Sequence, residues 1–220
     1  QESAHAVTAG HWTALEKALQ AGEYFIKAGE YGKIADYAND LAVVRDADEP
    51  LYARLSPLLD RSITLVREHG TTLERYGGFL THWDFMPQNF RIRNDKLYLL
   101  DLTSMRFGNK YEGWARFVNF MELYNPELAH ALTEYVRLNR TEEESDALKV
   151  MRAYRLVELL RYYATWLGKT GGNTRALALA RIAFWTDVLA AVLEDRQVAP
   201  ESVAHYTQKR DSLRSEDEKR

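Results

Sequence analysis

The segment from residue 79 to residue 101 breaks the helical periodicity of the sequence around it. Two strand-like runs, residues 90–93 and 96–100, are separated by Asn94 and Asp95, which tolerate the positive φ angles of a tight hairpin turn. Pro87, just before them, cannot continue a helix because it has no amide hydrogen. The segment therefore predicts one β-hairpin, entered through a short strand at Phe79.

Apolar residues recur at helical spacing before this segment. Between residues 11 and 42 they predict two helices, divided near Gly29 and Gly32. A further helix is predicted over residues 50–70, with a kink or break at Pro57. The chain before the hairpin is thus expected to be mostly helical.

Helical spacing returns after the hairpin, in residues 114–124. Asn125 and Pro126 are an N-cap and a first-turn proline, so they predict the start of another helix. A capping box predicts a long amphipathic helix over residues 141–168, and a final apolar helix is expected over residues 174–194.

These patterns predict an α+β fold that is predominantly α, with a single domain over residues 1–199. Its parts are a helical segment (1–78), a central loop and hairpin (79–104) and a helical bundle (111–195). Residues 200–220 are expected to be a charged C-terminal tail, because the last of them are too charged to pack.

The composition of the chain argues against several kinds of binding partner. A net charge of −3 lacks the basic excess of nucleic-acid-binding domains, so no nucleic-acid partner is expected. The absence of cysteine excludes disulfides and thiolate zinc sites, and it favours a cytoplasmic protein. The most apolar stretch, residues 176–193, is interrupted by Arg181 and Asp187, so no membrane partner is expected.

Polar residues in and beside the predicted hairpin suit phosphoryl transfer. The pattern is His82-x-Asp84-x-x-x-x-Asn89, followed after the hairpin by Asp101. Phosphoryl transfer needs a carboxylate that receives the proton of the attacking hydroxyl, and oxygen ligands that hold magnesium on the phosphates. Residue 89 should pair with Leu100 across the hairpin, so Asn89 and Asp101 are expected to meet at its open end. Ordinary turn chemistry also uses Asp and Asn, but the spacing, the proline and the hairpin together favour the functional interpretation.

This pattern resembles the aminoglycoside phosphotransferase and choline kinase group, which shares the protein-kinase-like fold. Residues 82–89, His-Trp-Asp-Phe-Met-Pro-Gln-Asn, are similar to the group's His-Gly-Asp-Phe-x-Pro-x-Asn loop, and Leu99-Leu100-Asp101-Leu102 is similar to its hydrophobic-hydrophobic-Asp element. The resemblance implies that Asp84 is the catalytic base and that His82 organises the catalytic loop. It also implies that Asn89 and Asp101 bind Mg²⁺ and, through it, the nucleotide.

Two positions depart from the group's pattern. Trp83 replaces the glycine that usually lies between the histidine and the aspartate of the loop. In the element Tyr111-Glu112-Gly113-Trp114-Ala115-Arg116, glycine occupies the position of the group's aspartate, and the neighbouring Glu112 is a candidate substitute. The group also places a small β-rich, lysine-bearing lobe before the catalytic loop. No such segment precedes residue 80, so an N-terminal nucleotide-binding lobe is expected upstream.

The resemblance implies a magnesium-dependent phosphotransferase that moves the γ-phosphoryl group of ATP or GTP to a hydroxyl of a small molecule, amine-bearing acceptors included. Helix carboxylates such as Glu122 and Asp187 are candidates to bind an amine, although they more often form a solvated face. The alternative is a non-catalytic pseudokinase or helical interaction module. Gly113 and the missing lobe favour that alternative, whereas Asp84, Asn89 and Asp101 oppose it.

Overall fold

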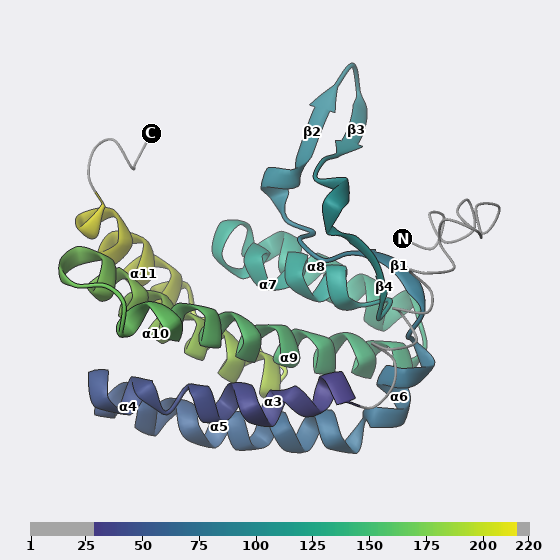
Figure 1. The fold of residues 1–220 in the computed structure, drawn as a ribbon. Coiled ribbons are helices and arrows are strands. Elements are labelled where there is room, and N and C mark those ends of the chain that lie inside the picture. The colour runs from purple at the N-terminus through teal and green to yellow at the C-terminus, as the bar shows by residue number, and fades with distance from the viewer. Residues whose placement is uncertain (1–28, 215–220) are drawn as a thin grey trace. The chain divides into compact units, whose positions relative to one another are not determined.

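The computed structural model describes residues 29–214, and these fall into two compact units (Figure 1). Unit 1 contains residues 29–32 and 67–152, and unit 2 contains residues 33–66 and 153–214. The fold is α+β and predominantly helical, as the sequence predicts. The first of the two helices expected between residues 11 and 42, and the most charged end of the expected tail, lie outside the described residues.

In unit 1, two antiparallel strand pairs bracket the candidate loop. Strand β1 (Phe79–His82) pairs with β4 (Met105–Gly108), and β2 (Phe90–Arg93) pairs with β3 (Lys96–Leu99). Short 3₁₀ turns, η1 (Pro87–Asn89) and η2 (Leu102–Ser104), connect one pair to the other. The sequence predicts β1 and the hairpin but not β4. Figure 1 shows the β2–β3 hairpin projecting away from the helices of this unit.

The hairpin has the predicted register. Phe90 lies opposite Leu99, and the amide of Leu100 donates to the carbonyl oxygen of Asn89 at 2.7 Å. Asn94 and Asp95 both adopt positive φ angles, 50° and 56°, as a tight two-residue turn requires. The open end of the hairpin therefore brings residues 89 and 100 together, one residue before Asp101.

Two of the helices that follow the hairpin begin where their caps predict. Helix α7 (Glu112–Tyr124) leads to α8 (Pro126–Asn139), whose N-cap Asn125 accepts a hydrogen bond from the Leu128 amide at 3.0 Å. Helix α9 (Glu142–Leu167) opens with the predicted capping box, in which the amides of Thr141 and Glu144 each donate to the other residue's side chain at 3.2 Å. Buried Val118, Met121 and Ala129 join α7 to α8.

Three helices, α3 (Gly29–Asp40), α4 (Val43–Ala47) and α5 (Glu49–Glu68), begin the described residues. Helix α3 begins at Gly29, near the predicted division, and continues through Gly32, whereas α5 continues through Pro57 without a break. Leu51, Leu55, Leu58, Leu59 and Val66 are buried along α5, and their burial offsets the backbone hydrogen bond that the proline removes. Gly70 does not end α5 but begins the short helix α6 (Gly70–Arg75).

Unit 2 ends in two packed helices, α10 (Gly172–Leu193) and α11 (Pro200–Leu213). The sequence prediction placed residues 200–213 in a charged tail and missed α11. Pro200 occupies its first turn, and the buried Tyr206 ring stacks on Phe184 of α10 with a centroid separation of 4.8 Å. Among the described helices, α10 has the length and hydropathy of a membrane span, but 56% of its apolar window is buried, a pattern that core helices share.

Candidate active site

His82 connects the start of the candidate loop to the end of the hairpin. The side chain is buried at the end of β1, and its Nε2 lies 3.0 Å from the carbonyl oxygens of both Leu100 and Asp101. Because carbonyl oxygens only accept hydrogen bonds, Nε2 carries the hydrogen. His82 therefore connects the end of β1 to the backbone that follows the hairpin.

Asn89 holds Asp84 through its amide nitrogen. Asn89 Nδ2 donates to the backbone oxygen of Asp84 at 2.7 Å and to its carboxylate Oδ2 at 3.0 Å. An asparagine has a donor nitrogen and an acceptor oxygen, so this arrangement leaves Oδ1 of Asn89 as the atom suited to bind a cation. Two of the predicted site residues, Asp84 and Asn89, are thus in direct contact.

Arg116, which the sequence analysis did not single out, pairs with the proposed base. Its Nε and Nη2 donate to Asp84 Oδ1 at 2.8 Å and 2.5 Å. Together with Asn89, Arg116 engages both oxygens of the Asp84 carboxylate. The two side chains are 21% and 28% exposed, so the pair is only partly screened by water. Arg116 lies in α7, far from Asp84 in sequence, and no local pattern predicts their contact.

Aromatic side chains fix the loop and the hairpin base against α7. The rings of Phe85 and Phe90 meet edge to face with centroids 4.8 Å apart, and Phe117 of α7 lies within 6.0 Å of both. Edge-to-face contacts of this kind restrict ring orientation. Residues 84 and 89, which flank these rings, are therefore held on a packed support rather than on a free loop.

Asp101 has a strained backbone and a hydrogen-bonded carboxylate. It adopts a left-handed conformation with φ 55°, which is uncommon for a residue with a side chain. Its two carboxylate oxygens accept hydrogen bonds from Ser104 Oγ at 2.6 Å and Thr103 Oγ1 at 2.5 Å. These hydrogen bonds, Ser104 first, lower the pKa of Asp101 below its usual range. The exposed carboxylate is therefore ionised at neutral pH.

Asn89 and Asp101 together fit a magnesium ion carried by a nucleotide. Mg²⁺ keeps several water ligands and is usually bound by one or two protein groups plus phosphate oxygens. The amide oxygen of Asn89 and the ionised carboxylate of Asp101 are hard oxygen donors at the same end of the hairpin. Within residues 29–214, no three His, Cys, Asp or Glu side chains gather to hold a metal ion. A cation at the hairpin base would therefore depend on the phosphates for its remaining ligands.

Glu112 does not join Asp84 and Asn89, although the sequence makes it a candidate substitute for the missing aspartate. It is buried and forms an ion pair with Arg106 of β4. The Arg106 guanidinium in turn lies 3.3 Å from the ring centroid of Trp83, the residue that replaces the loop glycine. Trp83 and Glu112 thus both contact Arg106.

The helix carboxylates considered for an amine-bearing acceptor are engaged in ion pairs. Glu122 of α7 pairs with Arg152 of α9 at 2.6 Å, and each side chain is 9% exposed. Asp187 of α10 pairs with Arg54 of α5 in unit 2. Both carboxylates thus already have a charged partner in the structure.

Comparisons with known proteins identify no relative: no family model, no curated protein and no solved structure matches this chain. The geometry at the hairpin base is therefore the main evidence for function.

Proposed function

We propose that this chain is the catalytic lobe of a magnesium-dependent phosphotransferase, which moves the γ-phosphoryl group of ATP or GTP to a hydroxyl of a small acceptor, amine-bearing acceptors included. One observation carries the proposal: at the open end of the β2–β3 hairpin, Asn89 donates to Asp84 through Nδ2 and its carbonyl oxygen accepts from the amide of Leu100, the residue before Asp101. The similarity of residues 82–89 and 99–102 to the aminoglycoside phosphotransferase and choline kinase loop supports it.

In this mechanism Asp84 orients the acceptor hydroxyl and receives its proton. Arg116 donates twice to Oδ1 and Asn89 donates once to Oδ2, so Oδ2 keeps a further lone pair for the hydroxyl. Asn89 Oδ1 and Asp101 would hold Mg²⁺, which when bound neutralises charge on the phosphates. Positioning of the acceptor and charge neutralisation are the main contributions that a protein makes to this chemistry.

The same proposal includes a cytoplasmic location, which is supported by the absence of cysteine. Nucleotide and a small acceptor are then the expected ligands, with no nucleic acid and no membrane among the partners.

A second candidate function is a non-catalytic pseudokinase or helical interaction module. The ion pair between Arg116 and Asp84 favours it, because the carboxylate that would act as base already has a structural partner. The pairing of Glu112 with Arg106 favours it as well, since the nearest carboxylate to the missing family aspartate is buried elsewhere. The two candidates differ in whether the hairpin base binds a magnesium nucleotide.

The thermal midpoint with Mg²⁺ and ATP, GTP or ADP separates these two candidates. A ligand at a hundredfold excess over its Kd stabilises the native state by about 2.7 kcal/mol. For a chain of this size that corresponds to a rise of roughly 5 to 10 °C. We expect a magnesium-dependent rise that Asp101→Ala abolishes, whereas Asp95→Asn at the hairpin tip retains it. Equal responses of the two variants, or a rise without magnesium, would contradict the proposed site.

A further inference from the structure

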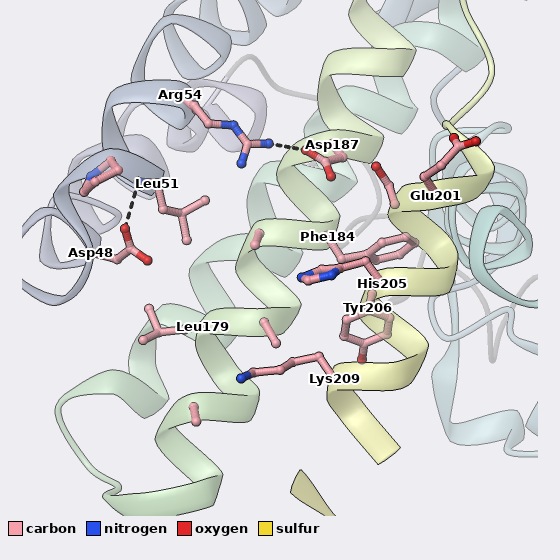
Figure 2. A pocket seen from close by; sticks show the side chains of 15 residues that line it. Asp48, Leu51, Arg54, Leu179, Phe184, Asp187, Glu201, His205, Tyr206 and Lys209 are labelled. Carbon is pink, nitrogen blue, oxygen red and sulfur yellow. Dashed lines mark hydrogen bonds and ion pairs between the residues drawn. The ribbon is translucent and has the colours of Figure 1, made fainter. Parts of the chain in front are cut away.

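A cavity lies in unit 2 and shares no residue with the candidate loop. It has a volume of ≈ 640 Å³, which is within the range of small-molecule sites. Its walls come from the beginning of α5, from α10 and from α11 (Figure 2). All of these elements belong to one compact unit.

One wall of the cavity is aliphatic. Ala176, Leu179, Ala180 and Ala183 repeat at helical spacing along one face of α10, and Leu51 of α5 lies across from Leu179 in Figure 2. The four α10 residues are partly exposed, so this face is not filled by the described residues. At 1.5 Å per residue, the stretch from residue 176 to residue 183 is about 10 Å long. That length suits an extended chain of about eight carbons.

The acidic residues that line the cavity are unsuited to bind a ligand there. Asp187 is paired with Arg54, and Asp48 Oδ1 accepts the Leu51 amide at 3.0 Å at the beginning of α5. Figure 2 shows the Glu201 carboxylate pointing away from α10. Asp187 and Asp48 are therefore already engaged in contacts, and Glu201 is directed elsewhere.

The basic residues of α11, in contrast to these acidic residues, extend into the cavity. His205 and Lys209 are four residues apart and so lie on one face of α11. Figure 2 shows both side chains extending from α11 toward α10 and into the cavity. Neither side chain forms a hydrogen bond or an ion pair within residues 29–214. The Lys209 ammonium and the His205 ring are therefore available to donate hydrogen bonds to a ligand.

From this combination we propose that the cavity binds a medium-chain aliphatic carboxylate. The carboxylate group accepts hydrogen bonds from Lys209 and His205, and the aliphatic chain lies along the alanine face of α10. An aliphatic carboxylate matches the Lys209 ammonium, the hydrogen-bonding ring of His205 and the apolar wall, and burial of the chain contributes to affinity in proportion to the apolar area covered. The site is independent of the phosphotransferase proposal, because none of its residues lies in unit 1.

Isothermal titration calorimetry with octanoate tests this inference on the whole chain. Octylamine has the same chain length and the opposite charge, so it serves as the matched ligand. We expect octanoate to bind at least tenfold more tightly than octylamine. Lys209→Gln and His205→Gln should each weaken octanoate binding by roughly threefold to tenfold, as loss of an exposed charged contact predicts. Lys169→Gln, an exposed lysine outside the cavity, should bind octanoate like the unmodified chain.

A filling substitution locates the bound chain. Ala180→Trp places a large side chain in the cavity from a partly exposed position, and we expect it to abolish octanoate binding while the thermal midpoint is retained. Equal affinity for octylamine and octanoate, no effect of Lys209→Gln, or undisturbed binding to Ala180→Trp would each overturn the proposal. So would the absence of octanoate binding at millimolar concentration.

Discussion

At the scale of single residues, the contacts of the Asp84 carboxylate matter most for the proposed site. Its carboxylate accepts from Arg116 on one oxygen and from Asn89 on the other, and it lies on the aromatic support formed by Phe85, Phe90 and Phe117. Groups held in this way lose little freedom when a substrate binds, which favours catalysis by positioning.

The Arg116–Asp84 contact can be measured as a coupling free energy. In a double-mutant cycle with Arg116→Ala and Asp84→Asn, we expect the two substitutions to be coupled by about 1 to 2 kcal/mol in the free energy of unfolding, because the pair is partly shielded from water. Urea unfolding of the four proteins gives this value. The exposed Arg137–Glu134 pair is a suitable reference, with an expected coupling below about 0.5 kcal/mol. Strict additivity at residues 84 and 116 would show that the ion pair does not form in solution.

The ionisation of Glu144 makes the free energy of unfolding depend on pH. Partial burial raises its pKa, but hydrogen bonds from Lys110 Nζ and the Tyr111 hydroxyl, both at 2.7 Å, outweigh that effect and lower the pKa to about 2. Since the folded pKa lies below the ordinary value of 4.5, the stabilisation is present above pH 4.5 and is lost as the pH falls toward 2. The expected loss is roughly 2 to 3 kcal/mol.

Unfolding measured by urea between pH 2 and pH 6 tests this dependence. Glu144→Gln should remove that part of the pH dependence, whereas Glu142→Gln, at an exposed position of the same helix turn, should leave it in place. An unchanged pH profile in Glu144→Gln would show that another carboxyl group causes the acid sensitivity.

At the scale of elements, the strand pair β1–β4 depends on a close approach at Gly108. A Cβ atom added there would lie 2.5 Å from Glu112 Oε2 and 3.1 Å from Thr81 Cγ2. We expect Gly108→Ala to displace the buried Glu112 from Arg106 and to reduce the free energy of unfolding by about 1 to 3 kcal/mol. Gly70→Ala, where an added Cβ meets nothing within 4 Å, should be neutral or slightly stabilising. Denaturant unfolding of both variants checks the difference, and equal stabilities would refute the close approach.

Elements with local determinants are the ones that the sequence predicts. The hairpin depends on two turn residues, Asn94 and Asp95, and the starts of α8 and α9 depend on capping residues within a few positions. The strand β4 and the helix α11 were missed because their stability comes from partners distant in sequence, β1 for the strand and α10 for the helix. Helix α5 continues through Pro57, so packing along α5 outweighs the local preference of proline.

At the scale of the whole molecule, the candidate site could be predicted in part. The pairing of Asn89 with Leu100, next to Asp101, follows from the hairpin register, and the loop spacing points to Asp84. Arg116, the Arg106–Glu112 pair and the cavity of unit 2 could not be predicted, because each joins elements whose packing no local pattern reveals. The prediction of phosphotransfer thus depends on local geometry, and its test must address the hairpin base directly.

The most direct test replaces magnesium with paramagnetic Mn²⁺ and follows the backbone amide signals by nuclear magnetic resonance in the presence of ATP. Paramagnetic broadening falls steeply with distance from the ion, so it locates the metal. We predict that Mn²⁺ broadens the signals of Asn89, Leu100 and Asp101 before those of Asn94 and Asp95 at the hairpin tip, and that Asp101→Ala removes this selectivity. Broadening that is absent from the hairpin base, or that is unchanged in Asp101→Ala, would contradict the proposal that Asn89 and Asp101 hold the metal beside Asp84.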